Sequence, residues 1–160
     1  ELEALRAANP RNPAVVAELA RVLRMASRDD EARQAAASAI RLALSGGAGP
    51  IAHDVFRSFA HEAIHLNLEP AVYEQLGRIL SARREFDGAS WCYRAAAALG
   101  GDPRALQKGL LSVAEMALET GEPERAASVF EAFARTWPDS PLAAFARDGA
   151  ESALRKAGVK

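Results

Sequence analysis

The sequence predicts an all-α fold made of antiparallel helix hairpins. Apolar residues recur at helical spacing in eight segments, and most connections between these segments are only a few residues long. No segment alternates apolar and polar residues between turn residues, as a half-buried strand would, and β-branched residues are sparse. Because short connections force consecutive helices to run antiparallel, we expect the helix hairpin to be the building block.

Prolines mark the start of most of the predicted helices. A proline at the first helical position gives up only an amide that would be unpaired anyway, and a preceding Asn, Asp or Ser can cap the helix. The starts are Asn12-Pro13, Gly49-Pro50, Glu69-Pro70, Asp102-Pro103, Glu122-Pro123 and Ser140-Pro141. Glycines mark the stops, at Gly46-Gly47, Gly100-Gly101, Gly121 and Gly158. These signals predict helices over residues 13–27, 29–45, 50–66, 70–83, 86–99, 103–120, 123–136 and 140–157, with a short additional helix over residues 2–8.

Two of the predicted hairpins repeat one residue pattern at a spacing of 37 residues. The matched positions are Tyr73, Leu76, Gly77, Leu80, Ala89, Tyr93 and Ala96 with Leu110, Val113, Ala114, Ala117, Ala126, Phe130 and Phe133. Small residues such as Gly77 let two helices cross closely, and a large residue such as Tyr93 fills the space beside the crossing. A weaker copy without the aromatic residue falls on Val16, Leu19, Ala20, Leu23, Ala32 and Ala39.

This pattern resembles the tetratricopeptide repeat, whose consensus of about 34 residues places large residues, Leu and Gly on its first helix and Ala and an aromatic residue on its second. Pro138, in the stretch TWPDSP, stands where the closing proline of that repeat belongs. The resemblance implies a right-handed α-solenoid of about eight helices that forms a single domain over residues 1–160. The expected parts are a repeat-like hairpin over 13–45, an additional helix over 50–66, repeats over 70–102 and 103–139, and a polar-backed capping helix over 140–157.

The composition is that of an ordinary globular protein. Apolar residues make up 49% and charged residues 26% of the 160 residues, and the formal net charge of -1 provides no basic excess for binding nucleic acid. No apolar run approaches the roughly 18 residues needed to cross a membrane, so direct insertion is not expected. Lysine occurs only at Lys108, Lys156 and Lys160 among abundant alanine, which indicates a GC-rich, bacterial gene. The single cysteine, Cys92, favours a reducing compartment and is expected to be a packed core thiol.

The stretch HEAIH, residues 61–65, matches the H-E-x-x-H pattern with which zinc peptidases bind their metal and activate water. On a helical wheel Ile64 falls on the apolar face of the predicted helix 50–66, and His61 and His65 fall on the opposite side with Asp54 and Arg57. No third ligand stands at a recognised spacing: Asp54 lies two helical turns from His61, too far to bind the same ion, and its charge roughly cancels that of Arg57. A zinc peptidase is therefore the least favoured alternative. Because serine-hydrolase and phosphate-loop motifs are also missing, we expect no catalytic residues, no metal and no cofactor.

The resemblance places the first helix of each hairpin along a concave surface. The residues that it places there, and that we expect to contact a partner, are Arg21, Arg24, Glu74, Arg78, Lys108, Leu111 and Glu115. Their mixed charges suit an extended or helical peptide held by ion pairs around an apolar contact, and a solvated face without a ligand is the alternative. The lysine and asparagine clamp with which some tetratricopeptide domains hold a chaperone C-terminus is absent.

These features predict a non-catalytic module of the bacterial cytoplasm that binds a protein or peptide, or scaffolds an assembly. A homo-oligomer stays open as one form of partner. A second hypothesis starts from the first residue, Glu1, which is not a methionine and suggests a fragment of a longer protein. The Ala- and Arg-rich repeats, the P-D-S-P turn and the last helix resemble regions attached to some bacterial membrane proteins, including rhomboid-type intramembrane proteases. In that hypothesis the chain is a cytoplasmic regulatory or docking domain, tethered to the membrane through a part outside these residues.

Overall fold

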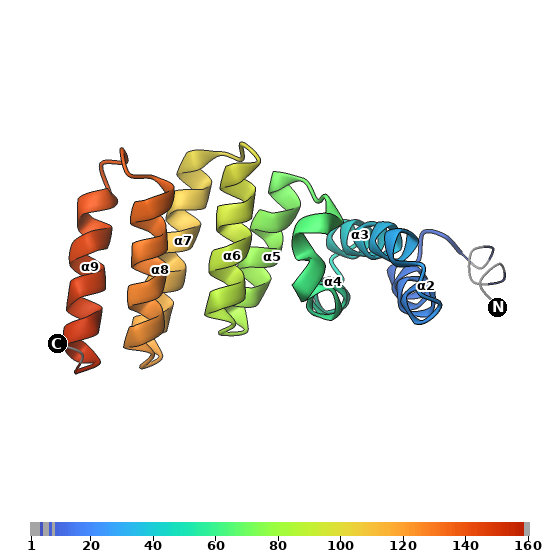
Figure 1. Cartoon of the computed structure of the whole chain (residues 1–160), viewed down its shortest axis with the longest axis horizontal. Coiled ribbons are helices and arrows are strands. Elements are labelled where there is room, and N and C mark those ends of the chain that lie inside the picture. Colours follow the sequence, from blue (N-terminus) through green and yellow to red (C-terminus); the bar gives the residue numbers. More distant parts are fainter. Residues whose placement is uncertain (1–3, 5–6, 8, 159–160) are drawn as a thin grey trace. The chain divides into compact units, whose positions relative to one another are not determined.

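The structure, a computed structural model, describes residue 4, residue 7 and residues 9–158. Within these residues every regular element is a helix, which confirms the predicted all-α class (Figure 1). The chain divides into two compact units, Glu1–Leu68 and Glu69–Lys160. The short helix expected over residues 2–8 falls almost entirely outside the described residues.

The first unit consists of four elements around a central helix. These are α2 (Pro13–Met25), α3 (Asp29–Ser45), α4 (Gly49–Ser58) and the 3₁₀ helix η1 (Ala60–Leu66). The start of α2 follows the predicted rule, because the Asn12 side chain accepts a 3.0 Å hydrogen bond from the Ala14 amide. Helix α3 packs against each of the other three elements, and it is rich in buried alanine, which lets its neighbours approach closely.

The prediction of one continuous α-helix over residues 50–66 was wrong in its second half. Helix α4 ends at Ser58, and the chain continues as a 3₁₀ helix until Asn67, which adopts a left-handed conformation with φ of 48°. A 3₁₀ helix repeats every three residues, so Ala63 and Leu66 share the buried face, whereas Ile64 is 70% exposed. The wheel with 3.6 residues per turn had placed Ile64 on the apolar face.

The second unit contains the helices α5 (Pro70–Ala82), α6 (Phe86–Ala98), α7 (Pro103–Glu119), α8 (Pro123–Thr136) and α9 (Ala143–Lys156). Each helix packs against the next one along the chain, and α5 also contacts α7 while α6 contacts α8. Helices α5 and α7 therefore form one layer and α6 and α8 the other (Figure 1). This is the arrangement of stacked helix hairpins, so the predicted building block is confirmed here; the handedness of the stack stays a prediction.

The positions of the 37-residue pattern form the core of this second unit. The members of both copies are buried: Tyr73, Leu76, Gly77, Leu80, Ala89, Tyr93, Ala96, Leu110, Val113, Ala114, Ala117, Ala126, Phe130 and Phe133. The last helix begins at Ala143 rather than at residue 140. Ser140 and the residues after it form a turn, in which the Leu142 amide donates a 3.2 Å hydrogen bond to the Ser140 hydroxyl. The outward face of α9 carries charged residues, namely Arg147, Asp148, Glu151, Arg155 and Lys156.

A second feature repeats at the same spacing and concerns how helices end. Helices α3, α5, α7 and α9 are each followed by a residue with positive φ, and these residues are Gly47, Arg84, Gly121 and Gly158. Consecutive members of this series are 37 residues apart along the chain. The amide of Arg84 donates to the Ser81 carbonyl and that of Glu85 to the Leu80 carbonyl, at 2.9 Å each, which is the Schellman pattern of helix termination. A common stop signal thus links α3 and α9 to the repeated hairpins.

Candidate functional site

A groove in the second unit lies between α5 and α7 and has a volume of about 440 Å³. The residues that line it are Arg78, Ser81, Ala82, Tyr93, Ala105, Lys108, Gly109, Ser112 and Met116. Two of the expected contact residues, Arg78 and Lys108, therefore line one groove from opposite sides. Glu74, Leu111 and Glu115 are on the same two helices but do not line it.

Tyr93, from α6, forms the floor of this groove because two glycines leave room for its ring. A Cβ atom on Gly77 of α5 would lie 2.9 Å from Cε2 of Tyr93. A Cβ atom on Gly109 of α7 would lie 2.6 Å from Cζ and 2.9 Å from the hydroxyl oxygen of the same ring. Non-bonded carbon atoms normally stay about 3.5 Å or more apart, so neither position tolerates a side chain while the ring stays in place. The ring is held between α5 and α7, with its hydroxyl end against Gly109.

The charges around this groove are mainly positive. Arg78 is ion-paired with Glu74 one turn before it, and its side chain is still 66% exposed. Lys108 is exposed and has neither a hydrogen-bond nor an ion-pair partner among the residues that the structure describes. Burial raises the pKa of Tyr93 above its usual value, the charge of Arg78 lowers it and that of Glu74 raises it. The hydroxyl thus stays protonated, as a hydrogen-bond donor, over the physiological range.

A comparable groove of about 370 Å³ lies in the first unit between α2 and α4. It is lined by Ala14, Ala17, Glu18, Arg21, Arg24, Ile51, Asp54, Val55, Ser58 and Phe59. The two expected contact residues of this unit line it but are held by their own chain. The Arg24 guanidinium lies over the Phe59 ring, 4.9 Å from its centroid, and donates to the Ser58 carbonyl. Arg21 is ion-paired with Glu18, which lowers the pKa of that carboxyl.

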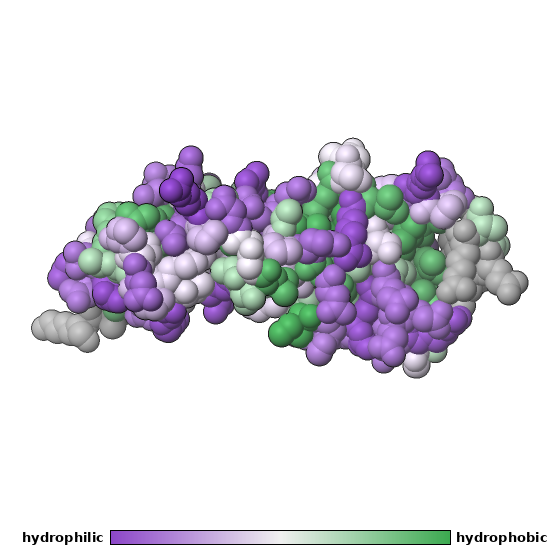
Figure 2. Space-filling view, turned by 90° about the horizontal axis from the view of Figure 1, so that it is seen from above, coloured by the Kyte–Doolittle hydropathy of each residue, from purple (hydrophilic) through white to green (hydrophobic). Residues whose placement is uncertain are grey.

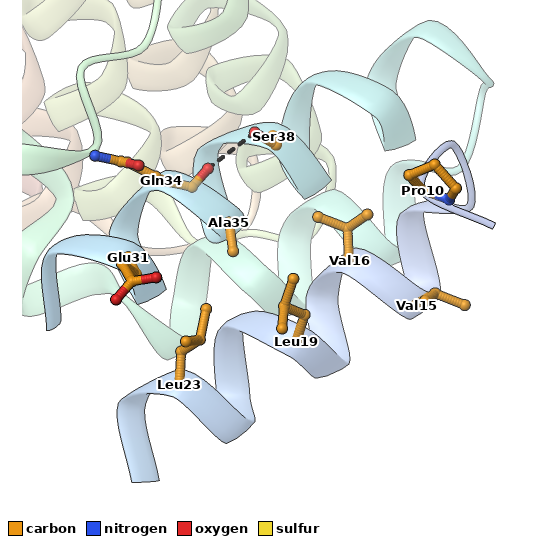
Figure 3. Close-up of a pocket in the computed structure, with 9 residues that line it drawn as sticks. All are labelled: Pro10, Val15, Val16, Leu19, Leu23, Glu31, Gln34, Ala35 and Ser38. Atoms are coloured by element: carbon orange, nitrogen blue, oxygen red, sulfur yellow. Dashed lines mark hydrogen bonds between the residues drawn. The ribbon is translucent and has the colours of Figure 1, made fainter. Parts of the chain in front are cut away.

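A third groove, which the sequence did not indicate, lies between α2 and α3 and has a volume of about 290 Å³. Figure 3 shows Val16, Leu19 and Leu23 pointing from α2 toward α3, and a hydrogen bond of 2.9 Å from the Ser38 hydroxyl to the Gln34 carbonyl on α3. Figure 2 shows hydrophobic residues at the surface of the protein among hydrophilic ones. The lining is mainly apolar, so this groove offers few groups that could select a ligand.

The H-E-x-x-H stretch does not form the arrangement that a zinc peptidase requires. Positions four apart are turned by about 40° in an α-helix but by about 120° in a 3₁₀ helix, so His61 and His65 do not share one face of η1. Glu62 pairs with Arg33 at 2.7 Å and with Arg24 at 3.6 Å. Across the described ranges, no group of three or more His, Cys, Asp or Glu side chains could hold a metal ion.

Cys92 and most of the aromatic residues of the second unit serve packing. Cys92 is fully buried, and burial raises the pKa of its thiol far above the usual range. Ring pairs join neighbouring helices or turns: Tyr73 with Trp91 at 5.6 Å, Phe130 with Phe145 at 6.2 Å and Phe133 with Trp137 at 5.1 Å between centroids. Tyr93 differs from these residues because it also lines a groove.

The chain matches no protein-family model and no curated protein. Its class is therefore defined by the fold and the grooves: an all-α protein with stacked helix hairpins and open grooves between helices of one layer. None of the helices that the structure describes combines the length and the apolar character needed to cross a bilayer.

Proposed function

We propose that this chain is a non-catalytic interaction module that binds a peptide or a segment of a partner protein in the groove between α5 and α7. The observation that carries the proposal is the placement of Arg78 and Lys108 on the two sides of one open groove with a preformed floor. A groove of this kind offers apolar contact from Ala82, Ala105 and Met116 and polar contact from charged side chains, which is what recognition of an extended segment requires.

The rigid floor supports this proposal on energetic grounds. Tyr93 is fixed between two helices, so a ligand would meet a surface that is already in its binding conformation and would not need to order it. The first-unit residues Arg21 and Arg24 contribute less in this proposal, because the carboxylates of Glu18 and Asp54 line the same groove and offset their charge. The proposed module is tetratricopeptide-like, bacterial and cytoplasmic, and it acts by presenting this surface.

The proposal is tested by selecting binders from a random peptide library displayed on phage, with the purified chain immobilised. Peptides enriched on the wild type are then measured against the double variant Arg78→Glu with Lys108→Glu. We expect binding to fall to background, because both charges on the groove are reversed. Circular dichroism should show unchanged helical content, since both side chains are exposed.

The control variant is Arg94→Glu with Lys156→Glu, which changes the net charge by the same amount at two exposed residues outside the groove. Binding to this variant should match the wild type. Peptides that bind all three proteins equally would show that the partner surface lies elsewhere. A library that yields no enriched peptide would count against peptide recognition itself.

A further inference from the structure

The groove between α5 and α7 is unbalanced in charge. Its described lining residues include two cations, Arg78 and Lys108, and no carboxylate. The groove between α2 and α4 differs, since its two arginines face Glu18 and Asp54 in the same lining. The positive charge of the second-unit groove is therefore a property of this site and not of every groove in the chain.

No acidic residue on α7 lies one turn away from Lys108. The positions one turn away from it on α7 are Arg104, Ala105, Leu111 and Ser112, and none of them is acidic. Arg104 adds a further positive charge one turn before Lys108. Lys108 thus lacks a carboxylate partner of the kind that Arg78 has in Glu74 and Arg125 has in Glu122.

Three hydrogen-bond donors come from three different helices around the groove. Arg78 belongs to α5, Lys108 to α7, and Tyr93 to α6, with its hydroxyl end beside Gly109. A carboxylate accepts up to about four hydrogen bonds, and those from charged donors are roughly twice as strong as neutral ones. The exposed hydroxyl of Ser112 lies one turn beyond Lys108 and adds a further donor on the same wall.

From this arrangement we propose that the groove between α5 and α7 binds an acidic peptide segment, with an Asp or Glu side-chain carboxylate held by Lys108, Arg78 and the Tyr93 hydroxyl. This inference rests on the proposed function and specifies its ligand. Flanking apolar side chains of the segment lie against Ala82, Ala105 and Met116, which gives a peptide an advantage over a free small anion. The complementary charge fixes the position of the segment and speeds its association.

The repeated hairpin indicates that the Tyr93 hydroxyl can be removed without disturbing the packing. The residue that matches Tyr93 in the next copy is Phe130, which packs against Gly149 of α9 as Tyr93 packs against Gly109 of α7. The fold therefore accepts phenylalanine at this position of the pattern. Tyr93→Phe removes one donor from the groove and leaves the ring that fills the space between the helices.

The experiment measures fluorescence anisotropy of a labelled probe, the peptide Gly-Leu-Asp-Glu-Leu-Gly, blocked at both ends so that only side chains are charged. Its neutral counterpart carries Asn and Gln in place of Asp and Glu. We expect the acidic peptide to bind the wild type at least about tenfold more tightly than the neutral one, with affinity falling as salt is added. Tyr93→Phe should weaken the acidic peptide about tenfold, the loss expected for one hydrogen bond to a charged group, and should not affect the neutral one.

Reversal of Arg78 and Lys108 should abolish binding of the acidic peptide, while the Arg94 and Lys156 reversal should leave it intact. Equal binding of the acidic and neutral peptides would overturn the charge preference and leave the proposed function standing. Binding only when the C-terminal carboxylate is left free would overturn the assignment to a side chain. If the acidic peptide does not bind at millimolar concentration, the inference fails. The proposed function would still be supported if the phage library enriches non-acidic peptides and their binding is lost in the double variant Arg78→Glu with Lys108→Glu.

Discussion

The ring of Tyr93 occupies the space that a side chain at Gly109 would need. Tyr93 belongs to α6 and Gly109 to α7, and the missing Cβ lets the hydroxyl end of the ring lie against the α7 backbone. One contact therefore has two consequences. It fixes how closely two helices of the second unit pack, and it sets the position of a residue that lines the groove between α5 and α7.

Gly109→Ala should destabilise the second unit. Alanine is ordinarily favoured over glycine inside a helix by up to about 1 kcal/mol, but here the added methyl group would overlap the Tyr93 ring. Overpacking of this kind costs about 1–3 kcal/mol, so the net effect on the free energy of unfolding should be a loss. Urea denaturation followed by circular dichroism measures it.

The matched control for that substitution is Gly88→Ala in α6. A Cβ atom on Gly88 would lie 3.5 Å from the nearest Leu80 carbon, which is an ordinary van der Waals contact. This variant should be as stable as the wild type or more stable. Equal effects of the two substitutions would mean that helix propensity, and not the Tyr93 contact, determines the role of Gly109.

Arg84→Gly should stabilise the chain by about 0.5–1 kcal/mol, because Arg84 adopts a φ of 61° that side chains with a Cβ disfavour. The three other positions of this series are glycines already. The thermal midpoint of the variant should rise. Arg83→Gly, one residue earlier at a φ of -93°, is the control and should lower the midpoint slightly. A lower midpoint for Arg84→Gly would show that the arginine side chain makes a compensating contact.

Glu62→Gln should destabilise the first unit by about 1 kcal/mol at most, because the carboxylate joins Arg33 and Arg24 in a partly exposed ion-pair cluster. The loss should shrink as salt is added. His61→Gln, at an exposed position of the same 3₁₀ helix, should have little effect. Zinc added in equal amount should not raise the thermal midpoint. If it does, and His61→Gln removes the rise, the histidine pair has metal-binding capacity.

The thiol of Cys92 predicts how stability changes in alkaline solution. Its pKa is strongly raised in the folded protein but lies near about 8.5 in an unfolded chain, so only the unfolded form loses this proton as the pH rises. The stability linked to this group is therefore fully present below about pH 8.5 and falls by about 1.4 kcal/mol per pH unit above it. Urea denaturation of the wild type and of Cys92→Ala between about pH 8.5 and pH 10 measures the difference in slope. Parallel slopes would show that the thiol ionises in the folded state.

The sequence predicted the helix boundaries well where local chemistry fixes them. Pro13, Pro103 and Pro123 begin their helices in the structure as expected, because a proline restricts the backbone whatever surrounds it. The helical wheel gave the wrong buried face for residues 60–66 because it assumes 3.6 residues per turn. These residues form a 3₁₀ helix, in which Ile64 points to the solvent.

The candidate site was predicted only in part. The resemblance to a helical repeat singled out Arg78 and Lys108, and in the structure both line the groove between α5 and α7; their contact with a partner stays a prediction. It did not identify Gly109 or the hydroxyl of Tyr93 as parts of a groove. A glycine within a helix has no local signature that distinguishes close packing from chance, and the contact exists only once three helices are assembled.

The even spacing of the helix stops divides this part of the chain into blocks of equal length. A cut after Arg84 and another after Gly121 isolate a block that carries one stop of this series, Gly121, and the helices α6 and α7 in their native order. Duplicating that block would lengthen the protein by 37 residues and keep every later stop in phase. Length is thus a property that can be changed in whole steps, by gene duplication as readily as by design.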